Sequence, residues 1–158
     1  MSITLKRAQL SDAEAMHMMQ VTAFLPLLEK YHDTAINPAC ETVERVREKI
    51  THSRCYFIME DGRAVGGIRV VQGPSTGGSK VISPLFVLAG YRGRGVAQRA
   101  VKLVESIHGA DGWKLNTILE EPGNCHLYEK IGYRKTGKTE TVNDKMTLVY
   151  YEKRSENG

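Results

Sequence analysis

The sequence predicts a mixed α/β (α+β) fold, in which helices cover the faces of a mixed central sheet of about seven strands. Its segments follow the order βααβββαβαββ, with four helices interleaved among the strands. The Asp61-Gly62 pair lies between two apolar runs and predicts a tight hairpin turn. The length of 158 residues suits one sizeable core, so we expect a single domain over residues 1–154 and a frayed tail at 155–158.

The first half of the chain contains a strand and two helices before that hairpin. Residues 3–9 read as the first strand. Ser11 and Glu14 match a capping box, which predicts a helix start, and we expect this helix to end near Pro26. Residues 41–50 place apolar side chains at helical spacing and predict the second helix.

The second half contains the remaining strands and two helices. Residues 80–89 read as a strand with Pro84 inside it, which predicts either a bulge or an unpaired edge at that position. A helix is expected from Gly93 to His108. After a strand at 112–120, a short helix capped by Asn124 and a closing hairpin complete the fold.

Composition narrows the classes of partner and compartment. The net charge of +4 is spread among acids, with no basic stripe and no interleaved aromatic residues, so nucleic-acid binding is not expected. No apolar run is long enough for a membrane span, and the N-terminus lacks a secretory signal. The three cysteines are widely spaced, which predicts neither a disulfide framework nor a metal site. We therefore expect a cytoplasmic protein without a metal.

The segment GYRGRGVAQRAV, residues 90–101, carries the strongest functional signal. Gly93 and Gly95 allow an anion to approach the backbone at a helix start, where N–H groups lack helical partners. Arg92 and Arg94 repel each other, and a bound polyanion would relieve that repulsion. Together these features predict a pyrophosphate site.

The known phosphate motifs do not match this segment. No P-loop string occurs, and the dinucleotide pattern G-x-G-x-x-G fails because Gln98 stands in its last place. The acidic pair Glu120-Glu121, which could hold a ribose, keeps the dinucleotide reading open. A plain surface turn with two solvated arginines is the other alternative.

Two segments resemble the GNAT-type N-acetyltransferases, which use acetyl-CoA. VLAGYRGRGVAQRAV resembles their acyl-CoA segment [QR]-x-x-G-x-[GA], here at Arg92, Gly95 and Ala97. NCHLYEKIGYRKTG resembles their fourth-helix segment, in which an Asn precedes a Tyr by four residues, here Asn124 and Tyr128. With the element order, the resemblance covers nearly the whole chain and implies the GNAT fold.

The resemblance implies coenzyme A, as acetyl-CoA, as the co-substrate. In such folds the fourth and fifth strands splay apart, and the pantetheine arm lies in the gap. Asn124 and Tyr128 would face the pantetheine or the approaching amine. The remaining implied positions are Phe86, Val87 and Leu88 for the pantetheine, and Arg92, Gly93, Arg94, Gly95, Val96 and Ala97 for the pyrophosphate.

The implied reaction is attack of a primary amine, from a small molecule or a protein, on the thioester. Tyr128 carries a proton donor for the thiolate, and Glu120 or Glu121 is the expected general base. The family often places a proline and a polar residue before the Tyr-Arg-Gly. This chain has Ala89 and Gly90 there, which makes the base harder to assign. A non-catalytic acyl-CoA sensor of the same fold is the alternative function, and the exposed closing hairpin is compatible with a homodimer.

Overall fold

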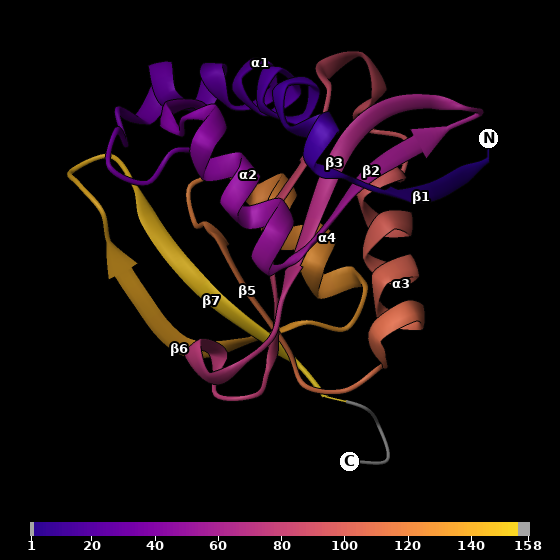
Figure 1. Cartoon of the computed structure of the whole chain (residues 1–158). Coiled ribbons are helices and arrows are strands. Elements are labelled where there is room, and N and C mark those ends of the chain that lie inside the picture. The colour runs from indigo at the N-terminus through magenta and orange to yellow at the C-terminus, as the bar shows by residue number, and fades with distance from the viewer. Residues whose placement is uncertain (1, 155–158) are drawn as a thin grey trace.

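The computed structural model describes residues 2–154, so the expected frayed tail at 155–158 lies outside the described residues. The described part contains one seven-stranded sheet and four α-helices, which confirms the predicted mixed α/β fold class (Figure 1). The strands are β1 (Ile3–Arg7), β2 (Arg54–Glu60), β3 (Arg63–Val71), β4 (Lys80–Val87), β5 (Trp113–Ile118), β6 (Arg134–Thr141) and β7 (Thr147–Lys153).

The strands lie in the order β1-β2-β3-β4-β5-β7-β6. All neighbours pair antiparallel except β4 and β5, which are parallel. The β2–β3 turn has Asp61 at φ 50° and Gly62 at φ 84°, as the predicted tight hairpin requires. The sheet therefore consists of an antiparallel N-terminal half and an antiparallel C-terminal half that meet at the β4–β5 pair.

Helices cover both faces of this sheet. One face carries α1 (Ala13–Tyr31) and α2 (Val43–His52), and the other carries α3 (Val96–His108) and α4 (Pro122–Lys130). Alternation along β2 shows the two faces, because Cys55 and Phe57 pack with α1 and α2 while Tyr56 and Ile58 pack with α3 and α4.

The start of α1 differs from the prediction, and the Ser11–Glu14 capping box is wrong. A 3-10 turn at Leu10–Asp12 precedes the helix, and Asp12 Oδ2 accepts a hydrogen bond of 2.8 Å from the Gln9 amide. Because Asp12 binds the Gln9 N–H just before the helix, the regular α-helix begins only at Ala13.

The end of α1 also differs, because the helix continues through Pro26 to Tyr31. A proline inside a helix removes one donor and pushes on the preceding turn. Tertiary contacts stabilise this region: the Ala23 carbonyl accepts a hydrogen bond from the Arg92 guanidinium, and the Tyr31 side chain is buried. Such long-range contacts cannot be predicted from the local pattern around Pro26.

Two further helix starts are corrected. The third helix begins at Val96, not at Gly93, because Gly93 and Gly95 have positive φ angles that an α-helix does not contain. The fourth begins at Pro122, so Asn124 lies inside it and is not its cap. Proline at the first helical position is favourable because its missing N–H would have no helical partner.

The irregularity predicted at Pro84 is present as a bulge. Ile68 on β3 pairs with Leu85 and Val70 pairs with Ile82, so one residue of β3 faces two of β4. The bulge therefore includes Pro84, which has no N–H to offer β3. No helix within residues 2–154 is long and apolar enough to cross a membrane.

The close approach of β3 to β4 gives a first testable prediction. A Cβ added at Gly66 would lie 2.2 Å from the carbonyl oxygen of Phe86, whereas one at Gly90 would meet nothing within 4 Å. We expect Gly66→Ala to lower the free energy of unfolding by about 2 kcal/mol or more, because backbone must shift to accept the methyl group. Urea unfolding measures this loss.

Gly90→Ala is the matched control and should change the free energy of unfolding by less than about 0.5 kcal/mol. Equal stabilities for the two variants would show that β3 and β4 are not so closely packed at Gly66.

Candidate functional site

The candidate site begins where β4 and β5 separate. These strands pair at only two positions, Lys80 with Trp113 and Val81 with Lys114, although both strands continue beyond them. The edge of β4 that faces β5 is therefore not paired with β5 over most of its length. The other edge of β5 pairs with β7. The splayed strands implied by the resemblance are present.

The three residues predicted to bind pantetheine differ in the direction of their backbone groups. The Leu88 amide donates a hydrogen bond of 2.8 Å to the Val65 carbonyl on β3. Since backbone groups alternate along an antiparallel strand, the Phe86 groups also face β3, while the N–H and C=O of Val87 face the gap. Of the three, Val87 is thus the residue whose backbone can bind a ligand between the strands.

The loop after β4 presents a run of backbone donors. Gly93 has φ 77° and Gly95 has φ 80°, conformations that favour glycine, and a Cβ at either would meet nothing within 4 Å. Among the hydrogen bonds of the described residues, none uses an amide N–H of residues 93–97. These N–H groups lie at the N-terminus of α3, where the helix dipole adds positive potential.

The two arginines of this loop have different surroundings. Arg94 donates to Glu60 Oε2 at 2.7 Å and lies over the Tyr91 ring, with its side chain 45% exposed. Arg92 instead donates to two backbone carbonyls, from Nε to Val87 at 2.8 Å and from Nη2 to Ala23 at 3.1 Å. Only Arg94 therefore keeps a guanidinium free of backbone contacts.

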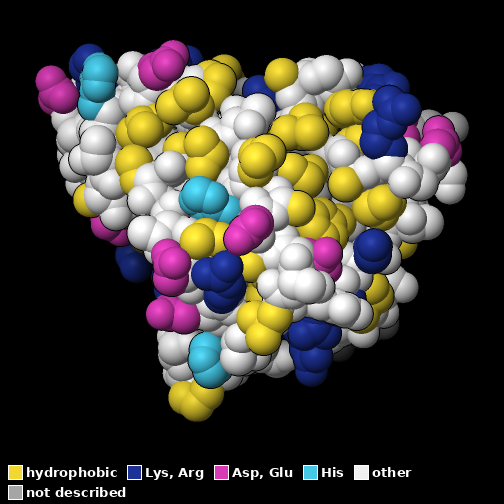
Figure 2. Space-filling view, turned by 45° about the horizontal axis from the view of Figure 1, so that its top comes forward, with side chains coloured by type: hydrophobic (Ala, Val, Ile, Leu, Met, Phe, Trp, Pro, Cys, Tyr) yellow, Lys and Arg dark blue, Asp and Glu magenta, His cyan; other side chains and the backbone are white. Residues whose placement is uncertain are grey.

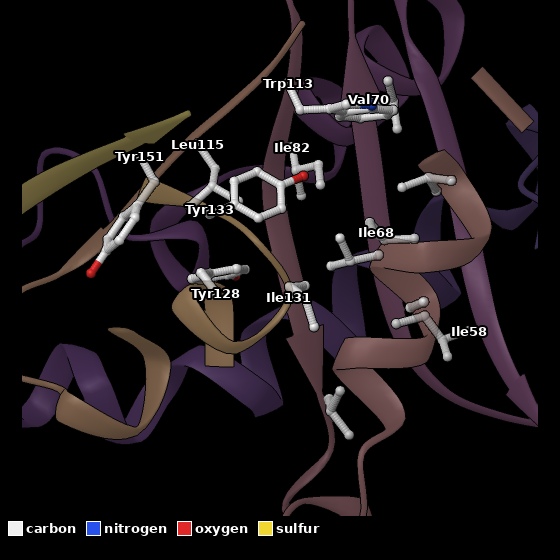
Figure 3. Close-up of a cluster of buried hydrophobic side chains, with 14 of the residues drawn as sticks. Ile58, Ile68, Val70, Ile82, Trp113, Leu115, Tyr128, Ile131, Tyr133 and Tyr151 are labelled. Carbon is white, nitrogen blue, oxygen red and sulfur yellow. The ribbon is translucent and has the colours of Figure 1, made fainter. Parts of the chain in front are cut away.

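Tyr128 lies on α4 within an aromatic cluster of the α3/α4 core (Figure 3). Its ring contacts Tyr133 edge-on at 5.9 Å and Tyr151 at 6.3 Å between centroids. The residue is only 8% exposed, and burial raises the pKa of its hydroxyl far above the ordinary value. Burial therefore favours the protonated form of Tyr128 at neutral pH.

The Tyr128 hydroxyl differs from those of its neighbours. Tyr133 donates to Glu105 Oε2 at 2.9 Å and Tyr151 donates to Glu129 Oε2 at 2.5 Å. Within residues 2–154, Tyr128 has no such partner, and no fully buried side-chain oxygen there lacks one. The Tyr128 oxygen therefore reaches the molecular surface, where it can donate to a ligand.

Asn124 precedes Tyr128 by one helical turn, so both side chains lie on the same side of α4. Asn124 is exposed, and its backbone N–H donates to the Glu121 carbonyl at 3.1 Å. Its side chain makes no hydrogen bond within the described residues, which leaves it able to bind a ligand.

The two predicted bases are both engaged. Glu120 Oε1 accepts from the Thr147 amide at 2.8 Å, and this bond lowers the pKa of the carboxyl. Glu121 Oε2 accepts from Lys30 Nζ at 2.7 Å and from the Tyr31 hydroxyl at 2.5 Å. Partial burial acts to raise the pKa of Glu121, but these two hydrogen bonds lower it overall. Both carboxylates are therefore weaker bases than ordinary glutamates.

Sequence reasoning did not find Lys30 and Asn143. Lys30 pairs with Glu121, and Asn143 Nδ2 donates to the Tyr31 carbonyl at 2.8 Å, so α1, α4 and the β6–β7 turn meet at Tyr31. The partners are 90 or more residues apart, and no local pattern in the sequence signals them.

The α1 side of the molecule presents an apolar surface. Figure 2 brings the top of Figure 1, where α1 lies, toward the viewer, and hydrophobic side chains gather there with scattered charges. Met18 and Leu25 on α1 are 71% and 43% exposed. In contrast, the acids of the α1–α2 connection are used internally: Asp33 accepts from Asn37 and Glu41 pairs with Lys49.

No group of three or more His, Cys, Asp or Glu residues in the part of the chain that the structure describes could hold a metal ion. The cysteines of the chain, Cys40, Cys55 and Cys125, are free thiols.

Comparisons with known proteins give a family match. The sequence profile described as "Acetyltransferase (GNAT) family" matches residues 21–133. A comparison with curated protein sequences finds no match.

Solved structures share the fold at low sequence identity. The PaiA N-acetyltransferase from Thermoplasma acidophilum, in complex with coenzyme A, is 13% identical with a TM-score of 0.71, covering 98% of this chain and 100% of that one. A GNAT family acetyltransferase from Elizabethkingia anophelis with acetyl-CoA bound is 12% identical with a TM-score of 0.67, covering 97% and 98%. The microcin C7 self-immunity acetyltransferase MccE, with acetyl-CoA and AMP, is 15% identical with a TM-score of 0.72, covering 97% and 92%.

The contacts of Glu121 predict a pH-dependent contribution to stability. Because the folded protein lowers the pKa of Glu121, its stabilisation is present above the unfolded pKa, about 4.3, and is lost as the pH falls through the lower folded value. We expect Glu121→Gln to lower the free energy of unfolding by about 1 kcal/mol at pH 7, since the ion pair is partly exposed, and by less at pH 3. Chemical unfolding at both pH values measures the difference.

Asp144→Asn, which changes an exposed acid of the β6–β7 turn, should have little effect at either pH. A loss in Glu121→Gln that is the same at pH 3 and pH 7 would contradict the charge contribution.

Proposed function

The chain belongs to the acetyltransferase (GNAT) family, and we propose that it transfers an acetyl group from acetyl-CoA to a primary amine of a small molecule or protein. One observation carries the proposal: the N–H groups of residues 93–97, which have no hydrogen-bond partner within residues 2–154, lie one 3-10 turn after the unpaired edge of β4. Bound CoA or acetyl-CoA in several proteins of the same fold supports a CoA co-substrate here.

The proposed cofactor site follows the backbone from β4 into α3. Residues 93–97 donate N–H groups to the diphosphate, and Arg94 adds charge from the exposed side of the loop. The pantetheine arm lies in the gap between β4 and β5, where the Val87 N–H donates to the thioester carbonyl and stabilises the negative charge that develops there. Asn124 supplies a further polar contact from α4.

The proposed reaction is direct attack of the amine nitrogen on the thioester carbon, followed by cleavage of the C–S bond. The thiolate leaves with the electron pair and takes a proton. Tyr128 donates its proton to the sulfur and takes up the proton that the amine nitrogen loses, so that no buried tyrosinate accumulates. This coupling is required because burial raises the pKa of Tyr128, whereas a thiol has an ordinary pKa of about 8.5.

Loss of the first amine proton is assigned to solvent rather than to Glu120 or Glu121. An ammonium group has a pKa of about 10.4, and both carboxylates have pKa values lowered below the ordinary 4.3 or so. Direct transfer of a proton from the ammonium to either carboxylate is therefore unfavourable by about six pKa units or more. We propose that the acceptor reacts in its neutral form.

Tyr128→Phe tests the proton donor. We expect kcat to fall by about 100-fold with the Kd for CoA nearly unchanged, because the ring still packs against Tyr133 and Tyr151. Release of free CoA from acetyl-CoA, measured against a panel of amines, gives the rate. Tyr150→Phe is the control, since its hydroxyl bonds Glu140 instead. An unchanged kcat would exclude Tyr128 as the donor.

Arg94→Ala tests the diphosphate site. We expect about tenfold weaker binding of CoA in titration calorimetry and unchanged binding of pantetheine, which has no diphosphate. Lys102→Ala, an exposed lysine on α3, should leave both affinities unchanged. Equal losses for CoA and pantetheine would place the diphosphate elsewhere.

The pH profile tests the source of the base. If solvent takes the amine proton, kcat/KM rises tenfold per pH unit until the pKa of the acceptor is reached. Because the pKa of Tyr128 is raised, loss of its proton should not lower kcat/KM at high pH. A plateau that begins near pH 5 would instead assign the base to a carboxylate. Binding of acetyl-CoA without turnover of any amine would favour the sensor alternative.

A further inference from the structure

The turn of α1 around Pro26 lacks part of the usual helical hydrogen bonding. Pro26 has no N–H to donate to the Thr22 carbonyl, and its ring pushes that carbonyl away. The Thr22 hydroxyl donates to the Met18 carbonyl at 2.9 Å, a bond that also tends to bend helices. Residues 22–26 therefore form a weak turn of α1, which contacts from outside the helix can stabilise.

That support comes from the glycine-arginine loop. Arg92 Nη2 donates to the Ala23 carbonyl, inside the weak turn, at 3.1 Å. The same guanidinium donates through Nε to the Val87 carbonyl at 2.8 Å. A planar guanidinium can hold two acceptors in a fixed relative position, which a lysine ammonium on a flexible stem cannot do.

The Val87 carbonyl lies on the edge of β4 that faces the gap. The N–H of Val87 faces the gap as well, whereas the Leu88 N–H donates a hydrogen bond to the Val65 carbonyl on β3. Arg92 therefore links the edge proposed to bind the thioester with the middle of α1. On the same face as α1, Phe86 of β4 packs against Phe24 with ring centroids 5.8 Å apart.

We propose that Arg92 is a positioning residue, which fixes α1 against the end of β4 and does not bind the diphosphate through its charge. Its role in CoA binding rests on the proposed function. The link itself does not, because it is present in the hydrogen bonding of the protein alone.

Arg92→Ala and Arg92→Lys distinguish position from charge. We expect both variants to bind CoA about tenfold more weakly than the wild type, because neither can hold both carbonyls. Near wild-type affinity in Arg92→Lys, with a loss only in Arg92→Ala, would overturn the proposal and assign Arg92 to the diphosphate. Pantetheine should weaken with CoA in both variants, and an unchanged pantetheine affinity would count against the proposal.

Amide hydrogen exchange of α1, measured without CoA, tests the link independently of the proposed function. Exchange of residues 22–28 should become at least about fivefold faster in Arg92→Lys and Arg92→Ala. Arg94→Ala is the matched control, since Arg94 pairs with Glu60 and should leave α1 unchanged. Unchanged exchange in both Arg92 variants would overturn the proposal even if CoA binding fell. Absence of CoA binding in the wild type would reject the proposed function and leave this test valid.

Pro26→Ala provides a coupled test. Restoring the N–H at position 26 should strengthen the turn, so Arg92→Lys should accelerate exchange in α1 much less in this background than in the wild type. An equal acceleration in both backgrounds would show that Arg92 does not compensate for Pro26.

Discussion

The separation of β4 from β5 after Val81 is the constraint on which the rest of the site depends. Pro84 lies in a bulge of β4 just beyond the last β4–β5 pair, and a bulge bends its strand. Within residues 2–154, the strand then continues to Val87 paired with β3 alone, and the 3-10 turn Ala89–Tyr91 leads into the loop before α3. One unpaired strand edge and one set of free loop amides thus follow each other along the backbone, which suits a long ligand with an anionic end.

The two faces of the sheet give this gap two different walls. On the α3/α4 side, Tyr128 is held by Tyr133 and Tyr151, so its hydroxyl has a defined position and a neutral form. On the α1/α2 side, Phe86 of β4 packs edge-on against Phe24 of α1. Tyr128 and the Phe24–Phe86 contact therefore lie on opposite faces of the sheet, one on each side of β4.

The sequence predicted those parts of the molecule that local chemistry determines. The Asp61-Gly62 turn, the irregularity at Pro84 and the number of strands and helices were confirmed because each produces a local pattern in the sequence. The prediction that α1 ends at Pro26 was wrong, because Arg92 and Glu121, which are far away in sequence, bind the helix at Ala23 and Tyr31.

For the candidate site, sequence indicated the loop and Tyr128. It could not indicate that Glu121 is held by Lys30 and Tyr31, nor that of the predicted strand residues Val87 faces the gap, since both depend on tertiary pairing. The most direct test of the account is amide hydrogen exchange by NMR on the wild-type protein with and without CoA. The account predicts that CoA slows exchange at Val87 and at residues 93–97. Binding of CoA that leaves these amides unchanged and protects others would contradict it.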